Sequence, residues 1–443
     1  MTDSSASRSD EPAFIRSIGP FQLTLYALGS MIGSGIYGLV GKASGEAGNA
    51  VWLAFLVALV AALLTALSYA SLGSRYPRAG GAAFATQRAF RSPLLSFVVG
   101  IALICSGLTS VATQSKIFAA NISELFGLTA WPPALFAFGF LLFLTGIVFR
   151  GIRESMWVNV LSTLIEATGL LIVISAGMSY WGSINYFETP PERAGDGFAI
   201  VMLQASVLTF FAFIGFEDAI NVAEECKNPS RTIPIGLACA TGIAAILYVT
   251  VAITAVSVVP WRDLSTAASP LTEVMRRAAP TFPPWIMTAI TLFSVGNTAL
   301  VNYITASRLI YGMARQGLLP ERLGLVHDIR ATPHVAISVL FLLLIPLVLA
   351  GSIADLAAST VLLLLLVFLC VNGALFVLKR RHEEAPGLFE VPAIMPALGF
   401  SVCAVLLVTR LASSDWTAPA IAGALIASSI ALFYALAPKP ASE

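Results

Sequence analysis

Three carboxylates stand in or beside long apolar stretches of this sequence, where an ionisable side chain is costly and marks a functional position by default. Glu166 lies in the middle of WVNVLSTLIEATGLLIVISAG, and Glu217 and Asp218 follow FFAFIGF. Glu166 could carry a proton, could help to bind a cation such as Na⁺ as a hard oxygen ligand, or could be a neutral packing residue. The chemistry indicated is proton or cation handling inside a membrane.

Two apolar segments are interrupted by glycine. Gly33, Gly35 and Gly38 fall within six residues of GSMIGSGIYG, and each costs a helix about 1 kcal/mol relative to alanine. In the second segment Gly215 precedes the two acids. Glycines of this kind can simply allow close helix packing. Here, however, the interruptions occupy corresponding positions in two halves of the chain, which is the pattern of a transporter binding site.

An interrupted helix exposes backbone groups that can bind a substrate. Free N–H and C=O groups are tolerated at membrane depth only where they meet a cavity, an ion or a ligand. The N-terminal end of a half-helix offers N–H donors and partial positive charge to a carboxylate, while freed carbonyls accept from an ammonium group. Together these groups match the two ends of an α-amino acid.

The composition indicates a chain surrounded mostly by lipid. Of its 443 residues, 57% are hydrophobic and 11% are charged, and the mean hydropathy is +0.86. A soluble domain carries about 25% charged residues. The net charge of +1 gives no reason to expect a nucleic-acid partner. The five cysteines lack CxxC spacing and the three histidines lie in or beside predicted loops, so we expect no metal site and no cofactor.

The carboxylates and the two interrupted segments lie in long apolar stretches, so we predict an all-α membrane protein. A span of the hydrocarbon layer needs about 20 apolar residues. Twelve candidate spans satisfy this requirement: 19–44, 50–74, 92–122, 133–149, 154–179, 198–225, 233–259, 284–313, 334–350, 355–378, 391–412 and 418–437. The predicted organisation is an N-terminal tail (1–18), a first repeat (19–180), a second repeat (198–378), two further helices (391–437) and a C-terminal tail (438–443).

The basic residues predict the orientation. Of the 25 lysines and arginines, eighteen lie on the side of the termini, five lie on the opposite side, and Lys116 and Arg410 fall inside or at the edge of spans. Because basic loops remain inside, we expect both termini in the cytoplasm and the protein in the cytoplasmic membrane. The polar N-terminal residues lack a signal-peptide layout. No GxxxxGK[ST] motif occurs, so uphill work would come from an ion gradient or exchange.

Three motifs in order resemble the amino acid–polyamine–organocation superfamily: GSMIGSGIYGLVG, FFAFIGFEDAINVAEECKNPSRTIP and ASRLIYGMARQGLLPERLGLVHDIRATP. The resemblance extends from about residue 15 to residue 380. It implies the leucine-transporter fold, with two inverted five-helix repeats (spans 1–5 and 6–10), broken spans 1 and 6, and two added helices. It also implies transport of amino acids, polyamines or related amines by alternating access.

The resemblance assigns a substrate site residue by residue. The substrate carboxylate would lie on Ile32, Gly33, Ser34 and Gly35, and the α-amino group would meet carbonyls of Phe211, Ala212 and Ile214. Phe211 and Phe216 would form an aromatic lid and side-chain pocket. The segments RYPRAGG (75–81) and GMARQGLLP (312–320) resemble gating segments.

The resemblance also addresses the charged residues. Many proton-coupled relatives carry lysine where Glu166 stands, in the place of a sodium ion between spans one, five and eight, so the charge here is reversed. Glu217 resembles a coupling or gating carboxylate, whereas we expect Asp218 to cap the second half-helix. Asn297, Thr298 and Asn302 either face the central site or act as polar contacts between helices. Lys116 either snorkels outward or marks a vestibule.

The predicted function is amino acid transport. The site lacks an intramembrane lysine or arginine to meet an acidic substrate, which favours neutral amino acids, with H⁺ as the coupling ion and Na⁺ as the alternative. An exchanger, a polyamine carrier or a non-transporting sensor of the same fold are the other interpretations. The expected partners are a small-molecule substrate and the lipid bilayer, and the sequence leaves the oligomeric state open. HExxH and GxSxG are absent, and we do not expect an enzyme.

Overall fold

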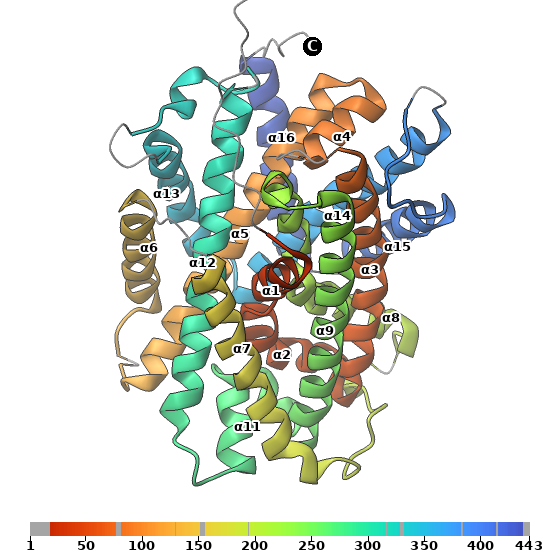
Figure 1. Ribbon diagram of the computed structural model, residues 1–443. Coiled ribbons are helices and arrows are strands. Elements are labelled where there is room, and N and C mark those ends of the chain that lie inside the picture. Colours follow the sequence, from red (N-terminus) through yellow and green to blue (C-terminus); the bar gives the residue numbers. More distant parts are fainter. Residues whose placement is uncertain are drawn as a thin grey trace, which may run out of the picture.

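The structure is a computed structural model that describes residues 18–76, 81–128, 130–150, 156–193, 195–315, 317–327, 332–381, 384–412 and 415–436. Long helices form one bundle, with α4 towards one end and α11 at the other (Figure 1). The α-helices are α1 (Pro20–Met31), α2 (Ser34–Ala47), α3 (Val51–Arg75), α4 (Gly81–Phe90), α5 (Pro93–Leu125), α6 (Pro133–Arg150), α7 (Met156–Gly177), α8 (Phe198–Phe210), α9 (Pro229–Val258), α10 (Trp261–Thr266), α11 (Pro270–Ala278), α12 (Pro284–Arg315), α13 (His334–Leu349), α14 (Ile353–Arg380), α15 (Ile394–Leu411) and α16 (Thr417–Leu436). Among the described residues there is no β-strand, which confirms the all-α prediction.

The predicted spans are matched along the chain. Ten continuous helical stretches of the described residues are long and apolar enough to cross a membrane. One of them, Gly35–Arg75, contains part of the first predicted span and all of the second, which meet where Gly48 adopts φ +65°. The shorter apolar helix His334–Leu349 matches the ninth predicted span. The inverted relation of the two repeats remains a prediction.

Three helices lie in segments that the sequence analysis treated as loops. Helix α4 (GAAFATQRAF) connects α3 to α5, and α10 and α11 connect α9 to α12. All three are far shorter than the length of about 20 residues needed to cross a bilayer. The search for long apolar runs therefore passed over them, although α11 buries a face formed by Leu271, Val274 and Met275.

The two predicted helix breaks are present. Helix α1 ends at Met31, Ile32 is extended with ψ 100°, and α2 begins at Ser34. The second broken segment runs from α8 into the 3₁₀ turn η4 (Phe211–Phe213). There Ile214 is extended with ψ 139°, Gly215 has φ +121°, and the 3₁₀ helix η5 (Phe216–Glu225) follows. Both breaks fall where the glycine pattern placed them.

The two breaks pack directly against each other. A Cβ atom added at Gly35 would lie 2.3 Å from the Cα atom of Ala212, and one added at Gly215 would lie 2.7 Å from the backbone of Ser30. Neither position has room for a side chain. Glycine is therefore required at both, because contact between the backbones of α2 and η4 holds the interrupted segments together.

The bundle exposes large apolar side chains on its outer surface and buries small residues between its helices, as expected for a protein surrounded by lipid. Large apolar side chains are exposed on the peripheral helices, among them Leu142 and Phe143 of α6 and Val408 of α15. Inside, α3 buries a row of small residues that includes Ala54, Ala58 and Ala62. Small residues allow helix backbones to approach closely, and α3 packs extensively against α9 and α8.

Replacement of Gly35 by alanine should destabilise the protein by about 1–3 kcal/mol, because the added methyl group overpacks the contact with Ala212. The measurement is thermal unfolding of purified protein in detergent. Gly146→Ala in α6 is the control, since a Cβ atom there meets nothing within 4 Å. A Gly35→Ala protein as stable as the control would show that the two breaks do not pack as described.

Candidate functional site

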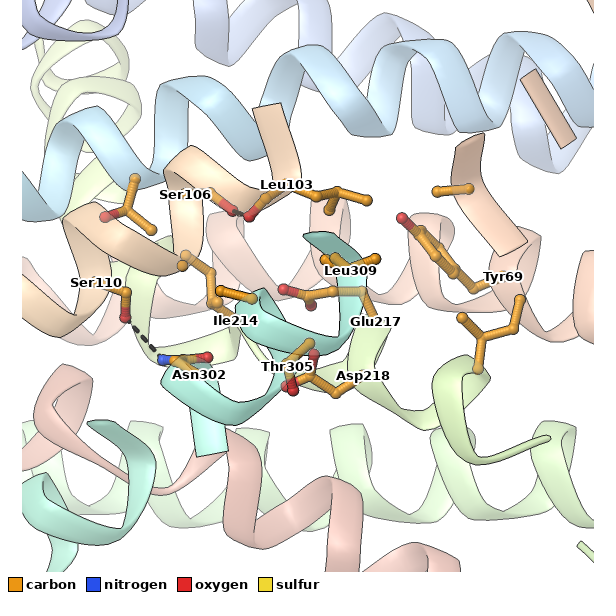
Figure 2. A pocket seen from close by; sticks show the side chains of 15 residues that line it. Tyr69, Leu103, Ser106, Ser110, Ile214, Glu217, Asp218, Asn302, Thr305 and Leu309 are labelled. Carbon is orange, nitrogen blue, oxygen red and sulfur yellow. Dashed lines mark hydrogen bonds between the residues drawn. The ribbon is translucent and has the colours of Figure 1, made fainter. Parts of the chain in front are cut away.

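Two adjacent cavities lie between the helix breaks and helices α5 and α12. The inner cavity is lined by Ser30, Met31, Gly33, Gly35, Ser110, Gln114, Phe211, Ile214, Thr298 and Asn302. The outer cavity extends past Glu217 and Asp218 to Tyr69 and to Ala82 of α4 (Figure 2). Ser110, Ile214 and Asn302 line both. The outer cavity therefore leads from the helix breaks towards the α4 end.

The structure gathers most of the predicted substrate residues at the inner cavity. Gly33, Gly35, Phe211 and Ile214 line it. The first N–H groups of α2 have no partner within the helix, because a helix leaves its first four donors unsatisfied. These donors begin beside Gly33, so the inner cavity adjoins a helix N-terminus that can bind a carboxylate.

The remaining predicted substrate residues lie around the cavity without lining it. The Ile32 carbonyl accepts a hydrogen bond from Ser294 Oγ of α12 at 3.4 Å, and Ala212 packs on Gly35. Phe216 is fully buried, with its ring 5.9 Å from that of Tyr69 and 5.2 Å from that of Phe368. Its ring belongs to an aromatic cluster beside the site. The side chain of Ser34 lies outside the described residues, although its backbone starts α2.

Glu166 of α7 is completely buried next to the first helix break. Its Oε1 atom accepts a hydrogen bond from Asn297 Nδ2 of α12 at 3.2 Å, and its backbone carbonyl accepts one from Tyr37 Oη of α2 at 2.5 Å. Its Oε2 atom has no partner. Glu166 thus contacts the first, fifth and eighth predicted spans, and no ion pair reaches it from the described residues. A buried carboxyl with one bare oxygen is well placed to hold a proton.

Thr298 follows Asn297 on α12 and points towards a different neighbour. Its hydroxyl donates to the carbonyl of Ser294, and a Cβ atom added at Gly33 would lie 2.4 Å from that hydroxyl oxygen. Thr298 lines the inner cavity. Helix α12 therefore supports the break through Ser294 and Thr298 and reaches Glu166 through Asn297.

Glu217 and Asp218 make hydrogen bonds with the turn at the second break and with the end of α1. Glu217 accepts a hydrogen bond from the backbone N–H of Gly215 at 2.9 Å, so it stabilises the turn at the second break. Asp218, which we expected to cap the half-helix, accepts from Ser30 Oγ at 2.8 Å and links α1 to η5. Both carboxylates line the outer cavity.

Sequence reasoning missed the contribution of α5. Ser106, Ser110 and Gln114 follow one another at intervals of four residues and lie on one face, which lines the cavities. The signal was available, because polar residues at that spacing in an apolar span form a stripe. Lys116, further along α5, donates to the carbonyls of Ala350 and Gly351 at the end of α13. It binds a helix C-terminus and lies outside both cavities.

Polar contacts join neighbouring segments at both ends of the bundle. At the α11 end, Arg193 contacts Glu46 and Gln204, and Lys42 Nζ donates to the carbonyl of Ser265 at 2.8 Å. At the α4 end, Glu390 pairs with Arg75 and Lys379. Residues 77–80 of RYPRAGG and residue 316 of GMARQGLLP lie outside the described residues.

Two glutamates hold the connection between α14 and α15 against α3 and α4. Glu384 accepts hydrogen bonds from Tyr76 Oη at 2.5 Å and Arg88 Nε at 2.7 Å. Partial burial raises the pKa of Glu390, but hydrogen bonds from Arg75, Lys379 and the Gly387 N–H outweigh this and lower it to about 2. The Glu390 carboxylate is therefore bound tightly while it is charged.

These features define a class of protein: a multi-span membrane transport protein with a cavity between two broken helices. Comparison with known proteins identifies the family. The family model described as amino acid permease matches residues 18–437, and the chain belongs to this family. The resemblance to the amino acid–polyamine–organocation superfamily is thereby confirmed.

The relatives transport different compounds. The chain is 29% identical to the branched-chain amino acid permease BcaP of Bacillus subtilis, over 92% of this chain and 90% of that protein. It is 27% identical to the methylthioribose transporter of Bacillus subtilis, over 90% and 89%. It is 28% identical to cationic amino acid transporter 4 of Mus musculus, over 85% of this chain but 62% of that protein. The family is therefore shown, whereas the relatives differ in substrate.

Glu390→Gln should destabilise the protein by about 1–3 kcal/mol at neutral pH, because it removes the negative charge that pairs with Arg75 and Lys379. The pKa of Glu390 is lower in the folded protein than its ordinary value of 4.5. Its contribution is therefore present above about pH 4.5 and is lost as the pH falls towards 2. Thermal unfolding at several pH values measures the difference in stability between the variant and the wild type. This difference should become smaller in acid, and a difference that does not change with pH would contradict the charged pairing. Glu192→Gln, at an exposed pair, is the control.

Proposed function

We propose that this protein is a secondary active transporter that carries neutral amino acids across the cytoplasmic membrane by alternating access, driven by protons. The observation that carries the proposal is the meeting of two broken helices at one buried cavity. The N–H groups at the start of α2 suit a carboxylate, and carbonyls at the second break suit an ammonium group. An α-amino acid carries both of these groups, so it can bind to both breaks at once.

The lining of the cavities supports a neutral substrate. Among the described residues, no lysine or arginine lines either cavity, so nothing there neutralises an acidic side chain. The acids Glu217 and Asp218 line the outer cavity but not the inner one. They favour a second candidate, a carrier of polyamines or other amines, in which the outer cavity would receive a second positive charge.

Glu166 is the proposed proton carrier. A protonated Glu166 is neutral and fits its buried surroundings, whereas ionisation would leave a charge with one amide hydrogen bond and no cation. Relief of that cost requires α7 to move relative to α2 and α12, which supply its neighbours Tyr37 and Asn297. The proton would thus be coupled to the opening of the site. A Na⁺ ion normally takes several oxygen ligands. Because the Asn297 N–H already bonds to one of the two carboxylate oxygens of Glu166, this arrangement favours a proton over Na⁺.

The distribution of charge supports the proposed orientation. Arg75, Arg88 and Lys379 lie at the α4 end, and the five residues that the sequence analysis assigned to the opposite side include Arg276 and Arg277 of α11. The positive-inside rule places the α4 end, and with it both termini, in the cytoplasm. The outer cavity would then extend towards the cytoplasm.

Neutral amino acids should raise the unfolding temperature of the purified protein. A ligand at 100 times its Kd adds about 2.7 kcal/mol to the stability of the folded state. The screen compares the twenty amino acids with polyamines, with and without Na⁺. Amines that lack the carboxylate and acids that lack the amine are matched controls and should be inactive. Stabilisation by polyamines alone would replace this proposal with the second candidate.

Glu166→Gln should reduce proton-driven accumulation about tenfold or more while exchange of internal for external substrate continues, because the amide can fill the site but cannot release a proton. The measurement is uptake into proteoliposomes with and without a pH gradient. Glu192→Gln, in an exposed loop, should behave as wild type. Unchanged gradient-driven uptake in Glu166→Gln would exclude this residue as the proton carrier.

A further inference from the structure

Three polar side chains form a connected group where the two cavities meet. Ser110 Oγ accepts a hydrogen bond from Gln114 Nε2 at 2.9 Å and another from Asn302 Nδ2 at 3.0 Å. Ser110 and Asn302 line both cavities, and Gln114 lines the inner one. Figure 2 shows the Ser110–Asn302 bond crossing from α5 to α12 beside Ile214. The group therefore joins the two helices that face the breaks.

The group leaves hydrogen-bonding capacity unused. Gln114 is completely buried, and its Oε1 atom has no partner. Asn302 uses its amide nitrogen for Ser110, and its carboxamide oxygen points away from that bond in Figure 2. Ser110 accepts twice, so its hydroxyl hydrogen remains able to donate. An unpaired buried polar group costs about 1–3 kcal/mol, so this arrangement needs a partner.

A purely structural role explains only part of this geometry. Polar side chains often connect membrane helices, and the two bonds to Ser110 do so. That role does not account for the bare Gln114 oxygen at the wall of a cavity. A ligand group that both donates and accepts hydrogen bonds would pair with the free Gln114 oxygen and with the Ser110 hydroxyl.

We propose that Ser110, Gln114 and Asn302 select an amino acid whose side chain carries a neutral hydroxyl or carboxamide. The inference rests on the proposed function and names the substrate class of the same site. With its carboxylate at α2 and its ammonium group at the second break, a bound amino acid directs its side chain towards α5 and α12. A side-chain carboxamide has two N–H donors and can donate to the oxygens of both Gln114 and Asn302, whereas a hydroxyl donates to one of them; either group accepts from Ser110.

The same geometry disfavours the two other classes of side chain. An aliphatic side chain would bury the Gln114 oxygen without a partner, and a site built for hydrogen bonds rejects analogues that lack them. A cationic side chain would find no carboxylate among the residues of the inner cavity, because Glu217 and Asp218 line the outer one. The selectivity therefore depends on neutral groups.

The test is a comparison of pairs with similar shape: threonine with valine, and asparagine with leucine. Binding to purified wild-type protein is measured by thermal shift, and transport by competition for uptake into proteoliposomes. We expect the polar member of each pair to bind at least about tenfold more tightly, which corresponds to about 1.4 kcal/mol. Lysine and ornithine should compete less well than glutamine.

Two variants test the assignment to these residues. Gln114→Met and Asn302→Leu replace each carboxamide with an apolar group of similar size, and each should reduce the threonine-to-valine preference about tenfold or more. Thr113→Val is the matched control, because Thr113 is buried on α5 and bonds only to the carbonyl of Thr109 among the described residues. It should keep the wild-type preference. The preference is a ratio within one protein, so a loss of folded material does not imitate the effect.

Each outcome separates this inference from the proposed function. Tighter binding of valine and leucine, or of lysine and ornithine, by the wild-type protein would overturn the selectivity while leaving amino acid transport intact. An unchanged ratio in both Gln114→Met and Asn302→Leu would overturn the assignment to this group. If folded protein binds no amino acid of any class, both proposals fail.

Discussion

Backbone groups without hydrogen-bond partners at membrane depth are the constraint on which this structure depends. Two helices are interrupted halfway, and hydrocarbon offers nothing to the N–H and C=O groups that the interruptions expose. The protein places the interruptions in contact, so that Gly35 lies against Ala212 and Gly215 lies against Ser30. The groups that remain free border a cavity. The cavity is thus the place where backbone groups of the two breaks can remain without a hydrogen-bond partner inside the protein.

The side chains around the interruptions connect them to the rest of the bundle. Asp218 ties the end of α1 to η5 through Ser30, and Ser294 of α12 reaches the carbonyl of Ile32. On the other side of the break, Tyr37 of α2 contacts the backbone of α7 at Glu166. Tyr37 of α2 and Asn297 of α12 are thus the contacts that would link the proposed proton carrier to the proposed substrate site. Under the proposed mechanism, such short connections would let a proton and a substrate affect the same movement.

The relatives differ in the substrates that their names give: they include a branched-chain amino acid permease and a methylthioribose transporter. In this chain, the walls contributed by α5 and α12 are separate from the backbone contact between the breaks. Ser110, Gln114 and Asn302 occupy those walls here. Their free oxygens and hydroxyl make the local chemistry polar, although most of the chain is apolar.

The sequence by itself determined the spans, the two breaks and the depth of Glu166, because hydrophobic length, glycine cost and charge are local properties that survive any arrangement of the helices. It did not determine which side chains meet. Phe216 was expected in the substrate pocket but packs with Tyr69 and Phe368, and the bond from Ser30 to Asp218 was not foreseen. The polar stripe that contains Ser110 and Gln114 can be read from the sequence of α5, but its contact with Asn302 depends on α5 lying beside α12. Such pairings depend on helix rotation and contact between distant segments, which only the tertiary structure decides.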